Sequence, residues 1–332
     1  MAIRASAPVR ICDIGGWTDT WFGGPGRVVN LAVAPGAEVT LRHTDDAGSV
    51  LLNVVDFADR YEVHPGAARR ARHPLLEACI DALPPPEGLA VDIEVRSDVP
   101  PGCGVGTSAA VAVAVLGALA GLRAEQWSPE RVAAQAHRVE TEVLGSESGV
   151  QDQLSAALGG LNYIEIDRYP LATVHRLPAW SDLGARLVVV SLGAAHDSAA
   201  LHRRVIEATG PGRADVLARL REAAGAARQA VLARDLVEFG RAMVVGTDAQ
   251  RSLLPALVGT DAERVIEVAK AVGALGWKVN GAGGEGGSLT LLADSPADAA
   301  ALGRAVARAD SRYTVLPVAL SEQGLSVKFD GP

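Results

Sequence analysis

A glycine-rich turn followed by hydroxyl residues is the part of the sequence whose residue types point most directly to chemistry. Residues 98–122 read DVPPGCGVGTSAAVAVAVLGALAGL, with glycines at 102, 104 and 106, followed by Thr107 and Ser108. Glycine lets the backbone approach a ligand closely, and the free N–H groups at the start of a helix favour an anion. The turn could therefore hold phosphate, or it could be a tight strand-to-helix connection capped by a Thr or Ser hydroxyl.

Two familiar phosphate-binding motifs do not fit this chain. A P-loop requires a lysine directly before its Ser or Thr, and Gly106 occupies that position. The glycines at 281, 283 and 286 match the spacing of a dinucleotide-binding fingerprint, but that fingerprint must open a helix. Residues 288–292, SLTLL, are typical of a strand, so a Rossmann-type site is a weak interpretation.

Two carboxylates, Glu140 and Asp152, lie twelve residues apart beyond the turn. Residues 129–144 are predicted to form a helix in which Glu140 falls within the apolar stripe, whereas Glu142 points away. A buried carboxylate is costly unless a cation or a donor meets it. Glu140 is therefore either a hydrogen-bonded core residue or a Mg²⁺ ligand. Asp152 lies near the start of a short predicted helix, 149–158, where an acidic residue also favours the helix dipole.

Composition narrows the class of protein. The chain has 332 residues, 48% of them hydrophobic and 21% charged, and its formal net charge is −8. That length provides an ample core in one large or two ordinary domains. The negative charge argues against a nucleic-acid partner, which would require a basic surface.

Targeting and redox signals also bear on the class. The N-terminus lacks the apolar core of a signal peptide, and the longest apolar run, residues 109–122, is too short to span a bilayer. Cys12, Cys79 and Cys103 show no metal-binding spacing, which favours free thiols in a reducing compartment. We expect a cytoplasmic protein without a membrane partner.

The predicted elements change in type along the chain. Strands are expected at residues 3–14, 28–33, 38–43, 50–55, 89–96, 161–166 and 187–191, with a short helix at 74–83. A loose, proline-containing segment, 167–184, precedes the last of these strands and marks the expected boundary. Helices follow at 196–207, 214–233, 236–254 and 262–275. A strand at 288–292, a helix at 296–309 and strands at 313–317 and 325–329 then close an α/β sandwich. We predict a two-domain α/β (α+β) fold, divided into residues 1–180 and 181–332.

Residues 100–110, PPGCGVGTSAA, resemble the central motif of the GHMP kinases, the family of galactokinase, homoserine kinase and mevalonate kinase. The family pattern is a proline, spaced glycines and small hydroxyl residues followed by alanine. In that family the loop wraps the phosphates of ATP without a lysine. The resemblance implies that ATP is bound by Pro101, Gly102, Cys103, Gly104, Val105, Gly106, Thr107, Ser108 and Ala109.

Residues 7–20, APVRICDIGGWTDT, resemble the first motif of the same family. The turn is similar to the Gly-Gly-x-(Ser/Thr)-Asp segment of fucose and heptose-phosphate kinases, in place of the Gly-Glu-His-Thr-Asp turn of galactokinases. The resemblance assigns Arg10 to the transferring phosphate and Gly16, Trp17, Thr18 and Asp19 to the substrate. Without it, Asp19 could be a turn residue, and Arg10 a solvated charge on an edge strand.

Two more segments complete the resemblance. The spacing of Glu140 and Asp152, and the segment GVQDQ at 149–153, are similar to galactokinase-type and heptose-phosphate kinases. This implies that Asp152 is the catalytic base, that Glu140 and Ser108 bind Mg²⁺, and that Gln151 contacts the substrate. Residues 274–287, ALGWKVNGAGGEGG, resemble the third family motif, which implies a substrate role for Gly283 and Gly284, although Glu285 interrupts the glycine run.

The resemblance covers nearly the whole chain and carries expectations about fold and activity. It implies an N-terminal domain related to the second domain of ribosomal protein S5, a ferredoxin-like C-terminal domain, and an active site between them. The expected activity is ATP-dependent, Mg²⁺-dependent phosphorylation of the anomeric hydroxyl of a sugar. Heptose 7-phosphate, fucose and a related sugar or cyclitol remain open as acceptors, and the protein is expected to be a monomer or a homodimer.

Alternative functions have recognisable signatures. A phosphorylated acceptor would need a second basic site, for which His202, Arg203 and Arg204 are candidates, or these are ordinary surface charges. A non-sugar alcohol such as mevalonate is disfavoured because Arg10 replaces the lysine typical of mevalonate kinases. A non-catalytic binding protein of the same fold would be expected to lose Asp152, Glu140 or Ser108, and all three are present.

Overall fold

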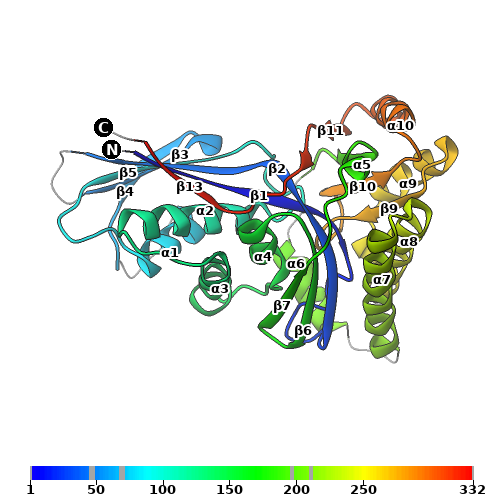
Figure 1. Ribbon diagram of the computed structural model, residues 1–332, viewed down its shortest axis with the longest axis horizontal. Helices are drawn as coiled ribbons and strands as arrows, with labels where there is room; N and C mark the ends of the chain where they lie inside the picture. Colours follow the sequence, from blue (N-terminus) through cyan, green and yellow to red (C-terminus); the bar gives the residue numbers. More distant parts are fainter. Residues whose placement is uncertain (1, 45–48, 67–71, 195–197, 209–211, 331–332) are drawn as a thin grey trace.

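Two β-sheets with helices packed on them make up the protein (Figure 1). The structure is a computed structural model that describes residues 2–44, 49–66, 72–194, 198–208 and 212–330. Its mixture of helices and strands confirms the predicted α/β class. None of the helices in these ranges combines the length and the apolar composition that a membrane span requires.

The larger sheet is built around two long strands, β1 (Ala2–Ile14) and β2 (Gly26–His43). Its main order is β13-β1-β2-β5-β3-β4, and β6, β7 and β12 join it through β2 and β6. One half of β2, residues 26–31, pairs with β6, and the other half, residues 37–43, pairs with β5. The remaining strands are β3 (Val50–Val54), β4 (Asp59–Val63), β5 (Val91–Ser97), β6 (Leu161–Arg168), β7 (Leu171–Arg176), β12 (Ala319–Leu320) and β13 (Ser326–Asp330).

Strand β1 is irregular where it approaches the candidate site. Its pairing with β2 shifts register between Ala7 and Val9 and again between Ile11 and Ile14. Within the second shift Cys12 has a φ of 55°, in the left-handed region. Residues three apart in a regular strand face opposite sides of the sheet. A bulge changes that alternation, and Arg10 and Asp13 accordingly both line one cavity.

Four helices cover one face of this sheet (Figure 1): α1 (Pro74–Ala82), α2 (Thr107–Leu122), α3 (Pro129–Arg138) and α4 (Gln151–Leu158). Helix α2 is apolar on all sides, so it is stable only when surrounded. It contacts β1 and β2 on one side and α1, α3 and α4 on others. Its central position fixes the glycine-rich turn that precedes it, residues 102–106, at the edge of the core.

The smaller sheet is antiparallel, in the order β11-β8-β10-β9. Its strands are β8 (Leu187–Ser191), β9 (Gly276–Val279), β10 (Ser288–Leu292) and β11 (Thr314–Leu316). Helices α9 (Thr260–Val272) and α10 (Pro296–Ala309) share a separate core with it. Helix α7 (Arg213–Ala233) contacts β1 and β2 of the larger sheet. Helix α8 (Leu236–Leu253) contacts α7, β1 and β9, so this pair of helices joins the two sheets. The short elements are α5 (Ser181–Gly184), α6 (Ser198–Glu207), η1 (Val55–Phe57) and η3 (Pro255–Leu257).

The structure corrects several element predictions. The strands expected at 28–33 and 38–43 are one strand, β2. The segment expected to be loose contains β7, which forms a hairpin with β6. The predicted helix over 129–144 ends at Arg138 and continues as a π-helical turn, η2 (Val139–Val143). The last strand, β13, returns to pair with β1 in the larger sheet, and so does not close the smaller one. The start of the predicted helix at His196 lies outside the described residues, and the division at residue 180 stays a prediction.

Candidate active site

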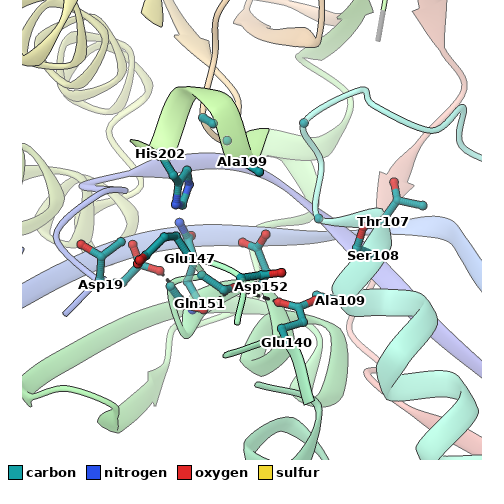
Figure 2. A pocket seen from close by; sticks show the side chains of 18 of the residues that line it. Asp19, Thr107, Ser108, Ala109, Glu140, Glu147, Gln151, Asp152, Ala199 and His202 are labelled. Carbon is teal, nitrogen blue, oxygen red and sulfur yellow. Dashed lines mark hydrogen bonds between the residues drawn. The ribbon is translucent and has the colours of Figure 1, made fainter. Parts of the chain in front are cut away.

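A cavity of about 370 Å³ lies where the two sheets meet. Six parts of the described chain line it: β1 with the turn that follows, Leu75 of α1, the glycine-rich turn with the start of α2, the segment 140–152, helix α6, and residues 281–282. Figure 2 shows Asp152 in the middle of the view, with Asp19, Gln151, Glu147 and His202 on one side of it and Thr107, Ser108 and Glu140 on the other. The cavity therefore has two different ends that meet at Asp152.

The glycine-rich turn leaves the N-terminus of α2 open toward the cavity. Gly106 is the N-cap residue of α2, with a φ of 74°, and no side chain caps the helix. The capping interpretation of Thr107 and Ser108 is thus not seen. The buried Thr107 Oγ1 finds no hydrogen-bond partner among the described residues. A helix start with uncapped N–H groups and an unpaired hydroxyl is suited to hold an anion such as phosphate.

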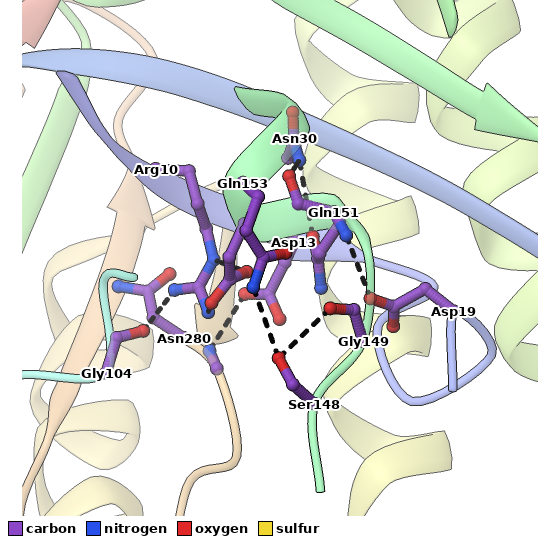
Figure 3. Close-up of polar contacts among 12 residues, drawn as sticks. Arg10, Asp13, Asp19, Asn30, Gly104, Ser148, Gly149, Gln151, Gln153 and Asn280 are labelled. Carbon is purple, nitrogen blue, oxygen red and sulfur yellow. Dashed lines mark hydrogen bonds and ion pairs between the residues drawn. The ribbon is translucent and has the colours of Figure 1, made fainter. Parts of the chain in front are cut away.

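Arg10, which is buried, and Asp152, whose side chain is 26% exposed, form a two-point ion pair. The Arg10 Nε lies 2.8 Å from Asp152 Oδ1, and its Nη2 lies 2.9 Å from Oδ2. The third nitrogen, Nη1, donates to the backbone carbonyl of Gly104 (Figure 3). Arg10 is only 4% exposed, so it is not a solvated charge on an edge strand. Through this side chain, β1 connects the start of α4 to the glycine-rich turn.

A second buried ion pair holds the third glycine segment against β1. Asp13 Oδ1 accepts a hydrogen bond from Gly281 N at 3.0 Å and lies 3.8 Å from Lys278 Nζ. Lys278 is 2% exposed, and its Nζ also donates to Gln250 Oε1 at 2.9 Å. Burial lowers the pKa of Lys278, and the charge of Asp13 opposes that shift. The sequence alone does not indicate a role for Asp13 or Lys278. Their pairing depends on contact between β1 and the segment 274–287, which only the fold provides.

Asp19 lies buried at the other end of the cavity, in the turn after β1. Its Oδ2 accepts a hydrogen bond from Gln151 N at 3.2 Å. Gly149 touches this carboxylate so closely that a Cβ there would lie 1.9 Å from Oδ2. Burial, reinforced by the charge of Asp152, raises the pKa of Asp19 to about 7. Asp19 is thus an acceptor held in a crowded, acidic environment.

Trp17 and His202 form the wall beside Asp19. Trp17 is 5% exposed and adopts a φ of 76°, which is uncommon for a bulky residue. Its ring centroid lies 4.7 Å from that of His202 on α6. Trp17 Nε1 is buried and makes no hydrogen bond to any described residue. Thr18 stabilises the turn, because its hydroxyl donates to Gly15 O at 2.7 Å.

Glu140 lies in the π-helical turn η2, where the helix of α3 widens beside the cavity. Its Oε2 accepts hydrogen bonds from Ser148 Oγ at 2.8 Å and from Gln153 Nε2 at 2.7 Å. Burial raises the pKa of Glu140 to about 7. Glu140 is therefore a hydrogen-bonded buried carboxylate that also lines the cavity, while Glu142 is exposed and pairs with Arg138.

The structure brings most of the predicted site residues to one cavity. Those that line it are Arg10, Trp17, Asp19, Gly102, Gly104, Gly106, Thr107, Ser108, Ala109, Glu140, Gln151 and Asp152, together with His202. Those that do not line it are Pro101, Cys103, Val105, Gly16, Thr18, Gly283 and Gly284, together with the exposed Arg203 and Arg204.

Local packing explains why some predicted site residues do not line the cavity. Gly283 and Gly284 approach Leu257 and Leu201, while Gly281 from the same segment reaches the cavity. Cys103 is buried, 3.6 Å from Ser191 Oγ, and Cys12, Cys79 and Cys103 are all unpaired thiols. The lining residues that the sequence did not indicate include Asp13, Glu147, Ser148 and Ala282. Asp13 and Ala282 fall within the first and third family motifs, and Glu147 and Ser148 directly precede the segment GVQDQ. Only the fold shows that these four residues line the cavity.

The arrangement suits transfer of a phosphoryl group to a hydroxyl, since an anion-binding helix start meets a carboxylate and a guanidinium. The domain described as "GHMP kinases N terminal domain" matches residues 71–160, and "GHMP kinases C terminal" matches residues 227–311. The two matches together span more than half of the chain. The chain belongs to the GHMP kinases. It is thus a member of a family of ATP-dependent small-molecule kinases with a two-domain fold.

Individual relatives carry different names. The mevalonate kinase of Thermococcus onnurineus (strain NA1) is 30% identical over 253 residues, which is 73% of this chain and 70% of that one. The bifunctional fucokinase/GDP-fucose pyrophosphorylase of Arabidopsis thaliana is 27% identical over 88% of this chain and 30% of that longer one. A crystal structure titled as a D-glycero-D-manno-heptose 1-phosphate kinase from Bacteriodes thetaiotaomicron superposes with a TM-score of 0.77. The two chains share 20% identity, and the match covers 99% of this chain and 100% of that one.

Proposed function

We propose that this GHMP kinase transfers the γ-phosphoryl group of ATP to the anomeric hydroxyl of a sugar or a related cyclitol, yielding the 1-phosphate and ADP. The observation that carries the proposal is the position of Asp152 between two ends of one cavity (Figure 2). One end offers the uncapped start of α2 for the donor phosphates. The other end offers Asp19 and Gln151, whose side chains suit the hydroxyl groups of an acceptor.

The proposed roles follow from what phosphoryl transfer requires. Catalysis depends on positioning and on neutralising charge at the transferred group. Backbone N–H groups of residues 104–108 would hold the phosphates of ATP, the co-substrate. Asp152 would take the proton of the attacking hydroxyl, and Arg10, already paired with it, would stabilise charge between donor and acceptor. An anomeric hydroxyl is more acidic than an ordinary alcohol, which lightens the task of Asp152.

The donor end also fits Mg²⁺. The described residues contain no group of three or more His, Cys, Asp or Glu side chains suited to hold a metal by themselves. Mg²⁺ usually needs fewer protein ligands, because it retains water and binds through one or two carboxylates plus the phosphates of the substrate. Glu140 and Ser108 would hold it here, and the known donors to Glu140 both meet Oε2, which leaves Oε1 for the cation. Bound Mg²⁺ would supply neutralisation of phosphate charge.

A sugar is favoured over mevalonate on two grounds, although the Thermococcus relative is named a mevalonate kinase. The turn GGWTD resembles that of sugar kinases, and Asp19 from this turn is buried at the acceptor end. Arg10 stands where mevalonate kinases typically have a lysine. A non-catalytic binding protein is disfavoured because Asp152, Glu140 and Ser108 are all retained at the cavity. We further expect a cytoplasmic protein, either a monomer or a homodimer.

The test is ADP release with Mg-ATP across free sugars, heptose 7-phosphates, cyclitols and mevalonate. Rapid, acceptor-dependent ADP release with a sugar or a cyclitol, and a 1-phosphate product by NMR, are expected. Turnover with mevalonate alone would replace the sugar assignment. If none of the acceptors stimulates ADP release, the result would contradict the proposed kinase activity.

A further inference from the structure

Carboxylates outnumber cations around the acceptor end of the cavity, and two of them are paired, Asp152 with Arg10 and Asp13 with Lys278. Five carboxylates line the cavity, and four of them, Asp13, Asp19, Glu147 and Asp152, come from the acceptor end and its junction with the donor end. These negative charges also affect Tyr169, which lies beside the acceptor end. Burial and then the charges of Asp19, Glu147 and Glu140 raise the pKa of its hydroxyl to about 12.

The cations near the cavity are already engaged. Arg10 is the single Lys or Arg among the described lining residues, and both its charge and its third nitrogen are taken by Asp152 and the Gly104 carbonyl. Lys278 lies beneath the third glycine segment, 2% exposed, and does not line the cavity. Arg203 and Arg204 are exposed on α6 and face elsewhere. The described lining residues therefore offer an anionic group one histidine, His202, whose ring packs on Trp17.

The hydrogen-bonding groups at this end are complementary to hydroxyls. Trp17, Asp19 and Glu147 all line this end of the cavity. Asp19 Oδ2 accepts a hydrogen bond from Gln151 N, and Glu147 Oε2 accepts one from Trp21 Nε1. A hydroxyl can donate to a carboxylate, whereas an ionised phosphate or carboxylate has only acceptors. Above pH 7, where the carboxyl group of Asp19 is ionised, an anion placed against it would bring like charges into contact.

Resting on the kinase function proposed above, we propose that the acceptor is uncharged: a free sugar or cyclitol, and neither a sugar phosphate nor a hydroxy acid. Asp19 and Glu147 select it by accepting hydrogen bonds from its hydroxyls and by repelling anionic analogues. Specificity then arises from a repulsive element as much as from an attractive one. A preference for an uncharged acceptor would favour a free sugar such as fucose over mevalonate or a sugar phosphate.

The test compares matched pairs of acceptors with the intact enzyme and Mg-ATP. Neutral hexoses, 6-deoxyhexoses and heptoses are assayed beside their terminal phosphates and uronic acids, with mevalonate as a further anion. We expect kcat/KM for the best neutral acceptor to exceed that of each anionic acceptor by at least about tenfold. A smaller margin, or a preference for the anion, would overturn the inference and leave the kinase assignment standing. ADP release with none of the acceptors would overturn the proposed function, and this inference with it.

A variant that removes one charge tests whether repulsion by Glu147 causes the preference for neutral acceptors. Glu147→Gln retains size and hydrogen bonding but removes one negative charge from the acceptor end. The preference for the neutral member of a pair should narrow by about three- to tenfold. Glu142→Gln removes the same charge from an exposed position in the nearby turn, where Glu142 pairs with Arg138, and the preference should not change. Equal selectivity in the wild type and Glu147→Gln would show that charge repulsion does not select the acceptor, and would overturn the inference.

Discussion

The guanidinium of Arg10 contacts both carboxylate oxygens of Asp152, at 2.8 and 2.9 Å, although the two residues are 142 positions apart. Two parallel N–H to O contacts fix the orientation of a carboxylate as well as its charge. Because Arg10 also donates to Gly104 O, the orientation of Asp152 is tied to the glycine-rich turn. A base and a phosphate-binding turn that share one cation are positioned together, which is what phosphoryl transfer requires.

Asp152→Asn tests the role of this carboxylate. The substitution keeps the size of the side chain but removes its ability to accept a proton. We expect kcat to fall by about two to four orders of magnitude, with ATP affinity by calorimetry nearly unchanged. Glu142→Gln, on the exposed side of η2, should leave kcat unchanged. Near-normal turnover of Asp152→Asn would mean that positioning and electrostatics alone drive the transfer.

Glu140→Gln tests metal binding at the donor end. We expect a lower kcat that a higher Mg²⁺ concentration partly restores. The substitution weakens one metal ligand, Glu140, and leaves the proposed base, Asp152, intact. Since burial raises the pKa of Glu140 to about 7, protons should compete with the metal in the wild type. The Kd for Mg²⁺, titrated by calorimetry with a non-hydrolysable ATP analogue present, should rise about tenfold per pH unit below 7. A Kd that is flat between pH 5.5 and 7 would argue against Glu140 as a ligand.

Asp19→Ala tests acceptor recognition. Loss of a buried, charged hydrogen-bond acceptor costs about 1.5–3 kcal/mol, or roughly ten- to a hundredfold in affinity. The KM for the sugar should therefore rise by that factor, while the KM for ATP changes little because Asp19 lies at the opposite end of the cavity (Figure 2). Equal increases in both KM values would identify Asp19 as a structural residue of the turn.

Asp19→Asn tests the energetic cost of the site. Asp19 has a pKa of about 7 in the folded protein against an ordinary value of 3.8. A carboxyl group whose pKa is raised on folding contributes stability below its unfolded pKa and loses that contribution as the pH rises through the folded value. The variant and the wild type should have the same free energy of unfolding near pH 4. At pH 8 the variant should be more stable by about 1–3 kcal/mol, measured by urea denaturation. A difference that does not depend on pH would contradict the raised pKa.

Gly149→Ala tests the packing behind Asp19. A Cβ at this position would lie 1.9 Å from Asp19 Oδ2, so the carboxylate or the loop must move. We expect the sugar KM to rise at least about tenfold. Gly145→Ala is the matched control. Its φ of 66° makes the substitution strained, but nothing lies within 4 Å of the added Cβ, so stability should fall slightly while the sugar KM holds. Identical kinetics for the two variants would show that Gly149 does not position Asp19.

Local sequence determined the elements whose formation depends on nearby residues. The all-apolar composition of 109–122 predicts a central helix, and the glycines at 102, 104 and 106 predict the tight turn before it. Both are present, because glycine conformation and helix amphipathicity act over a few residues. The spacing of Glu140 and Asp152 likewise placed both carboxylates near one site, although the π-helical turn that presents Glu140 was not predicted.

Tertiary structure decided which residues meet. Asp13 reaches the same cavity as Arg10 only because β1 shifts register between Ile11 and Ile14. Gly281, in place of Gly283 or Gly284, approaches the site because Asp13 of β1 accepts a hydrogen bond from Gly281 N and pairs with Lys278 of the same segment. The return of β13 to β1 is a pairing between the two ends of the chain. Register, buried ion pairs and long-range pairing depend on packing between distant segments, and no local propensity in the sequence encodes them.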